Sequence, residues 1–159
     1  IHSQNHQKLI RLRCMGQFIL KNQQQTEKLA KLLARACLAE AKRRRKIIKH
    51  ALIFGLVGNL GAGKTTFIQA FAKGLGIKAK ITSPTFVLMK NYKNLYHLDC
   101  YRIKNSKDVL DLDFKEIISI PKNIIMIEWA EKIKSILPKS TIWLKFKIIS
   151  RTERIISVK

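Results

Sequence analysis

The chain has 159 residues, 47% of them hydrophobic, and this length and composition predict one domain with a substantial core. Its 32 lysines and arginines outnumber 10 acidic residues, and the net charge of +22 fits either a polyanionic partner such as RNA or a general compositional bias toward lysine. Three widely spaced cysteines argue against a disulfide framework or a zinc knuckle, and no apolar run reaches the roughly 18 residues of a membrane span, so we expect a cytoplasmic protein without membrane contact.

The N-terminal part is expected to hold a short strand and a long helix. Residues 1–16 are polar and basic with weak periodicity, and we expect them to be a disordered extension. Residues 17–20 are predicted to be a strand, and Thr26 to cap a helix whose apolar residues recur at helical spacing. The helix runs into five consecutive basic residues at 42–46, which are either a solvated helix end or a contact for RNA phosphates.

A glycine-rich loop separates a buried strand from a second helix. Residues 51–57 (ALIFGLV) are a continuous apolar run, as in strands that parallel sheets bury on both faces. Residues 58–65 (GNLGAGKT) then fit G-x-x-x-x-G-K-[ST], the phosphate-binding P-loop, at every required position, and a helix is predicted from Lys64 to Leu75. The glycines let backbone N–H groups point at phosphate oxygens, Lys64 adds a charge, and the Thr65 hydroxyl is placed to ligate Mg²⁺. We therefore expect a nucleoside triphosphate and Mg²⁺, whereas the missing G-x-G-x-x-G pattern excludes a dinucleotide fold.

The remaining elements are expected to complete a mixed sheet. They are, in chain order, a hairpin of strands 86–92 and 95–101, a short acidic helix capped by Asn105 or Ser106, a buried strand 124–127, a helix to about Ile136, and paired strands 142–148 and 154–158. Strand, loop and helix followed by hairpins predict an α/β, P-loop NTPase-like fold, in which helices flank a mixed β-sheet, over residues 17–159.

A P-loop also needs a carboxylate near Mg²⁺, usually at the end of a neighbouring strand, and two candidates exist. Glu128 directly follows the buried strand 124–127, in the position of a Walker-B acid. Asp99 shares one face of an expected strand with His97 and Tyr101. Either acid can hold the metal or orient water. The alternatives are an ordinary strand-end charge for Glu128 and a structural ion pair for Asp99.

Four sequence runs together resemble a known family. GNLGAGKTT, SPTF, YHLDCYR and IEWAEKI match, in order and spacing, the TsaE family, also called YjeE, from about Gln17 to the C-terminus. The resemblance implies a weak P-loop ATPase, dependent on ATP and Mg²⁺, that is needed for threonylcarbamoyladenosine in tRNA. It implies TsaD and TsaB as partners and contact with tRNA only through their complex. TsaD would transfer the threonylcarbamoyl group, and ATP hydrolysis would reset the complex between turnovers.

The resemblance also assigns site residues. The phosphates would be held by Gly61, Ala62, Gly63, Lys64, Thr65 and Thr66; Mg²⁺ by Thr65 and Glu128; and hydrolysis would depend on Lys64, Asp99 and Glu128. Ser83, Pro84 and Thr85 would form a mobile loop near the γ-phosphate. Trp129 would lie beside the nucleotide, Thr26 and the turn before it near the nucleotide base, and Arg154 would be a further nucleotide contact.

The chain departs from the family pattern in three places. Asn59 stands where aspartate is usual, residues precede Met15, and the basic segment 34–50 resembles an insertion that extends the first helix. Two other functions are compatible with a P-loop but lack further support in the residues. A small-molecule kinase would need an arginine-rich lid, for which only the misplaced run Arg43–Arg45 is available, and a nucleic-acid-binding module would need an aromatic and basic stacking motif that is missing.

Overall fold

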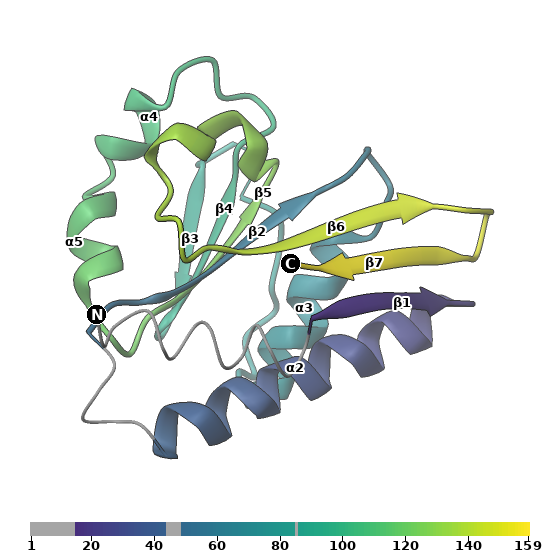
Figure 1. Cartoon of the computed structure of the whole chain (residues 1–159). Coiled ribbons are helices and arrows are strands. Elements are labelled where there is room, and N and C mark those ends of the chain that lie inside the picture. The colour runs from purple at the N-terminus through teal and green to yellow at the C-terminus, as the bar shows by residue number, and fades with distance from the viewer. Residues whose placement is uncertain (1–14, 44–48, 85) are drawn as a thin grey trace.

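The structure is a computed structural model that describes residues 15–43, 49–84 and 86–159. These residues form an α/β fold in which helices cover both faces of one mixed sheet (Figure 1), as predicted. The strands are β1 (Gly16–Leu20), β2 (Leu52–Val57), β3 (Met89–Tyr92), β4 (Leu95–Asp99), β5 (Ile124–Glu128), β6 (Ile142–Ile148) and β7 (Arg154–Val158). The helices are α2 (Gln23–Arg43), α3 (Lys64–Gly74), α4 (Lys107–Leu110), α5 (Phe114–Ser119) and the 3-10 helix η1 (Ala130–Ile136).

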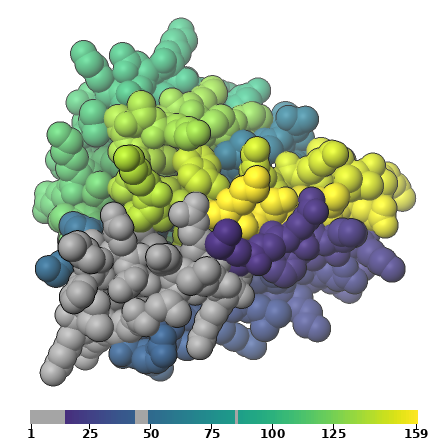
Figure 2. Space-filling model, in the orientation of Figure 1, coloured from purple at the N-terminus to yellow at the C-terminus, as the bar shows by residue number. Residues whose placement is uncertain are grey.

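The centre of the sheet is parallel and its two edges are antiparallel. The strand order is β1-β7-β6-β2-β5-β4-β3, with β2 parallel to β5 and β6, and β4 parallel to β5. At one edge β1 pairs with β7 of the β6–β7 hairpin, and the two strands lie side by side on the surface in Figure 2. Because parallel strands end at the same edge of a sheet, the loop after β2 lies beside the ends of β5 and β4. Glu128 is in register with both Leu56 and Asp99.

Two hydrophobic cores lie on opposite faces of the sheet. The first lies under α2 and α3 and includes Phe54 and Phe71, whose ring centroids are 5.4 Å apart. The second lies under α4, α5 and η1 and includes Ile53 and Phe114. Successive residues of a strand point to opposite faces, so β2 supplies both cores and is apolar throughout.

Most predicted elements are confirmed. The strands expected at 17–20, 51–57, 124–127, 142–148 and 154–158, and the helix expected at 64–75, agree with the structure to within one residue at each end. The hairpin turn at Lys93-Asn94 is also present, and Lys93 has the positive φ of 62° that such a turn uses. The short acidic helix begins after Ser106, and the Asn105 side chain accepts a hydrogen bond from the Lys107 N–H at 3.0 Å.

The predicted cap of the first long helix was wrong. Thr26 is buried inside α2, which already begins at Gln23. Asn22 takes the capping role, because its Oδ1 accepts a hydrogen bond from the Gln25 N–H at 3.0 Å. The Gln25 side chain in turn accepts from the Lys21 N–H at 2.8 Å, which ties the first turn of the helix to the residue before the cap.

The strand predicted at 86–92 was too long. β3 begins only at Met89, because a turn precedes it: the Val87 N–H donates to the Pro84 carbonyl oxygen at 2.9 Å, and Leu88 has a positive φ of 64°. The partner strand likewise ends at Asp99 instead of Tyr101. The chain therefore turns immediately beside the phosphate loop, which brings the Ser83 segment toward Asp99.

Some expectations concern segments that the structure describes in part. Residues 1–14, 44–48 and 85 lie outside the described residues, so the disorder predicted for 1–16 stays a prediction, although Gly16 belongs to β1. The basic insertion predicted at 34–50 also stays a prediction. Its first part is the end of α2, where Ala34, Cys37 and Glu40 are buried. Among the described residues, no helix is both long and apolar enough to cross a membrane.

Candidate functional site

The loop between β2 and α3 has the backbone geometry of a phosphate cradle. Gly61 and Gly63 have positive φ angles of 75° and 97°, which favour glycine, and Gly63 is the residue that leads into α3. Gly58 is required for a different reason: a Cβ there would lie 2.7 Å from the Phe146 carbonyl oxygen of β6. The start of α3 adds the unpaired N–H groups and the positive dipole end of a helix, so the loop is suited to bind an anion.

Lys64 lies folded back into the loop that it follows. It is only 4% exposed, and its Nζ donates hydrogen bonds to the carbonyl oxygens of Gly58 at 2.5 Å and Asn59 at 3.0 Å. The ammonium group also lies 4.1 Å from the ring centroid of Trp129, a cation–π contact. Burial lowers the pKa of Lys64, and the nearby Glu128 carboxylate is the largest of the charges that oppose this shift. A phosphate bound in the loop would offer this charge a stronger partner than two carbonyl groups.

Thr65 and Glu128 form the centre of the site. The Thr65 hydroxyl lies 2.8 Å from Oε1 and 3.0 Å from Oε2 of Glu128, whose carboxyl group is 4% exposed. Oε1 is also 2.8 Å from Nε2 of the fully buried His97. Of the two acids that the sequence offered as metal ligands, Glu128 is thus the one in contact with the P-loop threonine.

Asp99 lies at the end of the neighbouring strand and contacts a different segment. Its Oδ2 accepts a hydrogen bond from the Ser83 hydroxyl at 2.9 Å, and its Oδ1 accepts from the Tyr101 N–H at 2.9 Å. Ser83, Asp99, Tyr101, Glu128 and Trp129 line one cavity of about 260 Å³ together with the P-loop. The structure thus places Ser83, Asp99, Glu128 and Trp129, which the resemblance assigned to the site, around one cavity. Thr85, the last residue of the predicted mobile loop, lies outside the described residues.

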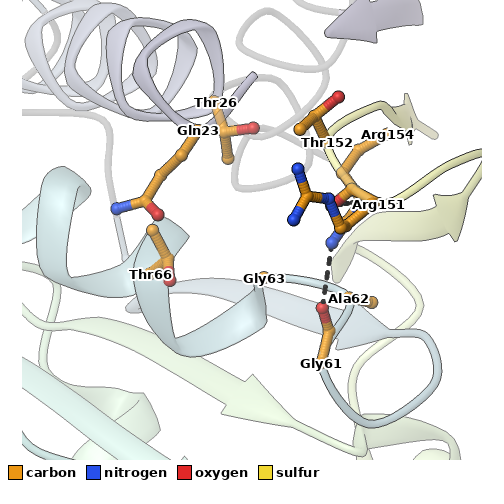
Figure 3. Close-up of a pocket in the computed structure, with 9 residues that line it drawn as sticks. All are labelled: Gln23, Thr26, Gly61, Ala62, Gly63, Thr66, Arg151, Thr152 and Arg154. Atoms are coloured by element: carbon orange, nitrogen blue, oxygen red, sulfur yellow. Dashed lines mark hydrogen bonds between the residues drawn. The ribbon is translucent and has the colours of Figure 1, made fainter. Parts of the chain in front are cut away.

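A second cavity of about 250 Å³ lies on the other side of the P-loop (Figure 3). It is lined by Gln23 and Thr26 of α2, by Gly61, Ala62, Gly63 and Thr66, and by Arg151, Thr152 and Arg154 near the C-terminus. Arg154 donates one hydrogen bond across this cavity, from Nη2 to the Gly61 carbonyl oxygen at 3.4 Å. Thr26 and Arg154, which are far apart in the sequence, therefore meet at the P-loop.

Two residues of the second cavity were missed by the sequence analysis: Arg151 and Thr152. Arg151 and Thr152 lie in the turn between β6 and β7, and only the closeness of that turn to the P-loop gives them a role. Gln23, the first residue of α2, lies in the turn before Thr26 that the resemblance placed near the nucleotide base.

The chemistry of these groups fits a nucleoside triphosphate with Mg²⁺. Backbone N–H groups, Lys64 and Arg154 supply positive charge for phosphates, whereas Thr65 and Glu128 supply the hard oxygen atoms that Mg²⁺ prefers. The described residues contain no group of three or more His, Cys, Asp or Glu side chains that could hold a metal ion by themselves. Mg²⁺ typically takes one or two protein ligands and completes its shell with phosphate oxygens and water, so the pair is sufficient.

Comparisons with known proteins find similarity to one family. The family model described as "Threonylcarbamoyl adenosine biosynthesis protein TsaE" matches residues 20–156. The tRNA threonylcarbamoyladenosine biosynthesis protein TsaE of Rickettsia felis is 37% identical over 145 residues, which are 88% of this chain and 77% of that protein. The protein of the same name from Bacillus subtilis is 35% identical over 137 residues, covering 84% and 78%. Among solved structures, YdiB of Bacillus subtilis superposes with a TM-score of 0.64 at 31% identity, covering 91% of this chain and 84% of that one.

Proposed function

Because the chain belongs to the TsaE family of threonylcarbamoyl adenosine biosynthesis proteins, we propose that it serves this tRNA modification as a weak, Mg²⁺-dependent ATPase. The observation that carries the proposal is the contact between the Thr65 hydroxyl and the Glu128 carboxylate at the start of α3. As metal ligands, Thr65 and Glu128 would hold Mg²⁺ directly beside the phosphate cradle, as hydrolysis of a Mg²⁺-bound triphosphate requires.

The residues of the site divide the work of binding. The N–H groups of the loop and of Thr65 and Thr66 would hold the β- and γ-phosphates, and Lys64 would turn from the carbonyl groups of Gly58 and Asn59 to the phosphate oxygens. Thr65 and Glu128 would hold Mg²⁺, which when bound neutralises the negative charge of those oxygens. On the other side of the loop, Arg154 and Thr26 would contact the rest of the nucleotide.

Asp99 is the residue we assign to the attacking water. Its carboxylate lines the same cavity as Lys64, Thr65 and Glu128, and its two oxygens are oriented by Ser83 and by the Tyr101 N–H. A carboxylate fixed in this way can accept a hydrogen bond from water and align it with the γ-phosphate. Because the Ser83 segment contacts Asp99 directly, a movement of that segment would alter hydrolysis.

The proposed partners are TsaD and TsaB. In this scheme TsaD transfers the threonylcarbamoyl group to tRNA in the cytoplasm, and ATP hydrolysis by this chain resets the complex between turnovers. Contact with tRNA is then indirect, through the complex. A switching role of this kind needs only slow hydrolysis, because the nucleotide state and not the phosphate product is what the partners recognise.

Phosphate release from ATP tests the proposal directly. The purified chain should release phosphate slowly with Mg²⁺, release almost none with EDTA, and change its rate when TsaD and TsaB are added. The matched control is Lys28→Ala, which removes an exposed lysine of α2 and should leave all three rates unchanged. Hydrolysis that ignores Mg²⁺, or a rate that ignores TsaD and TsaB together with no co-elution, would refute the proposal. Transfer of phosphate to a nucleoside or sugar would show a kinase instead.

A further inference from the structure

A buried histidine, His97, contacts the carboxylate of the proposed metal ligand Glu128. His97 lies in β4, is 0% exposed, and stands on the same face of the sheet as Leu95 and Asp99, the face that α3 covers. Its Nε2 is 2.8 Å from Oε1 of Glu128. Its Nδ1 is buried and has no hydrogen-bond partner among the described residues. The ring is therefore held by a single polar contact, and that contact is to Glu128.

The contacts decide which ring nitrogen carries the proton. An ionised carboxylate only accepts hydrogen bonds, so Nε2 must donate its N–H to Glu128. Nδ1 is then a lone pair. A buried acceptor without a partner is tolerated more often than a buried N–H without one. The opposite tautomer would leave an unsatisfied N–H at Nδ1 and set two lone pairs against each other across 2.8 Å.

We propose that His97 is a positioning residue, which fixes the rotation of the Glu128 carboxylate so that Oε2 is presented to Mg²⁺. The inference rests on the proposed function of Thr65 and Glu128 as the metal ligands. The last torsion of a glutamate side chain is broad, so a carboxylate without a fixed partner samples many rotations. His97 holds Oε1, which also lies 2.8 Å from the Thr65 hydroxyl, whereas Oε2 lies 3.0 Å from that hydroxyl and is the oxygen that His97 does not bind.

Residues that hydrogen-bond a metal ligand, without touching the metal themselves, commonly influence metal affinity. Their removal typically weakens metal binding by about 10–100-fold, because the ligand loses its orientation. Loss of His97 should weaken metal binding only. Among the described residues its one hydrogen bond goes to Glu128, and none goes to a glycine of the phosphate cradle. Nucleotide binding without metal should therefore survive the loss of His97.

Two amide substitutions separate positioning from packing. In His97→Gln the side-chain amide nitrogen can reach the place of Nε2 and donate to Glu128, whereas in His97→Asn the shorter side chain places its amide near Nδ1. His97→Met fills the space without a hydrogen-bonding group. With Mn²⁺ as the probe, electron paramagnetic resonance measures the free ion during titration of the full chain with ADP present. We expect the Gln variant to bind Mn²⁺ within about 3-fold of wild type, and the Asn and Met variants at least about 10-fold more weakly.

The buried amide side chain of Asn123 provides the control for lost stability. Asn123 is 3% exposed, donates from Nδ2 to the Ile117 carbonyl oxygen at 2.9 Å, and directly precedes β5, at the opposite end from Glu128. Asn123→Ala should lower the thermal unfolding midpoint and leave Mn²⁺ affinity and metal-free ADP affinity unchanged. If the Asn and Met variants behave in the same way, His97 has only a packing role and the inference is wrong.

A measurement on the wild-type chain covers the case in which the Asn and Met variants do not fold. Proton–nitrogen correlation spectra of the imidazole distinguish the two tautomers, and we expect the proton on Nε2 both with and without Mg²⁺ and ADP. A proton on Nδ1 in the loaded protein would overturn the inference. A wild-type chain that binds ADP but no Mn²⁺ would refute the metal role of Thr65 and Glu128, and the inference with it.

Discussion

Gly74→Ala tests the contact that holds α2 against α3. Gly74 is the last residue of α3, and a Cβ there would lie 2.7 Å from the Cβ of Ala34 and 2.9 Å from the Cα of Lys31, both in α2. It would also lie 3.0 Å from the Lys31 carbonyl oxygen. None of these atoms can rotate away, because all belong to the backbone or are bonded directly to it. The helices can therefore accommodate the methyl group only by moving apart.

The change in the free energy of unfolding is the sum of two opposing effects, a gain in helix propensity and a cost of overpacking. Glycine costs a helix interior roughly 1 kcal/mol relative to alanine, and less at a helix end, so the substitution gains at most that much. Overpacking a filled interface costs about 1–3 kcal/mol. We expect a net loss of about 1–2 kcal/mol in the free energy of unfolding, and a fall of about 2–8 °C in the thermal midpoint of a domain of this size. Adding Ala34→Gly should restore only part of the loss, since the Lys31 backbone stays in place.

Urea unfolding followed by circular dichroism measures this change for the two single variants and the double variant. Because α2 carries Gln23 and Thr26 while α3 carries Thr66, we also expect weaker ADP binding in Gly74→Ala, measured by calorimetry. A Gly74→Ala chain as stable as the wild type would show that the helices separate without cost. In that case the shape of the second cavity would not depend on the close approach of α2 and α3.

Three further predictions concern the site, and a fourth concerns Cys100, which follows Asp99 in the chain. Lys64→Ala should weaken ADP binding by at least about 10-fold in calorimetry, since a charge-assisted hydrogen bond contributes about 1.5–3 kcal/mol; unaltered affinity would contradict the cradle. Glu128→Ala should spare metal-free ADP binding and reduce Mg²⁺-dependent phosphate release, and unchanged release would reject its role. Gly63→Ala adds a methyl group with open space around it but at a φ of 97°, so the unfolding free energy should fall by about 1–2 kcal/mol, and an unchanged value would deny the strained backbone. Burial, helped by the charge of Asp99, raises the pKa of Cys100 to about 12, so iodoacetamide at pH 8 should label this thiol only in denaturant, as peptide mapping would show; rapid labelling of the folded chain would contradict its burial.

The sequence predicted the P-loop and its surroundings because that information is local. Strand, glycine loop and helix are consecutive, so residues 51–75 fix both the motif and its structural context. The position of Glu128 at the end of a buried strand was equally readable. The residue pattern alone did not show which acid meets Thr65, and Glu128 was assigned only through the family resemblance. The contact depends on the register of β5 against β2, and register is a property of the assembled sheet.

The errors have separate physical reasons. Thr26 is a good capping residue by type, but Asn22 precedes three glutamines that continue the helix backward by one turn. The apolar residues at the start of 86–92 suit a strand, but the turn at Pro84–Val87 and the positive φ of Leu88 prevent extension before Met89. Arg151 and Thr152 carry no motif, and they reach the P-loop only because β1, α2 and the β6–β7 hairpin pack beside it.

The groups assigned to ligand binding are bonded to one another in this structure, and this has a consequence for affinity. Lys64 donates to two loop carbonyl groups, Thr65 to Glu128, and Arg154 to Gly61. Each bond must be exchanged for a ligand contact, so the net gain per contact is a small difference between two hydrogen bonds. A metal ion alone would have to open the Thr65–Glu128 bond without any phosphate oxygen to complete its shell. Bound nucleotide should therefore raise the affinity for Mg²⁺, and bound Mg²⁺ should raise the affinity for the nucleotide by the same factor.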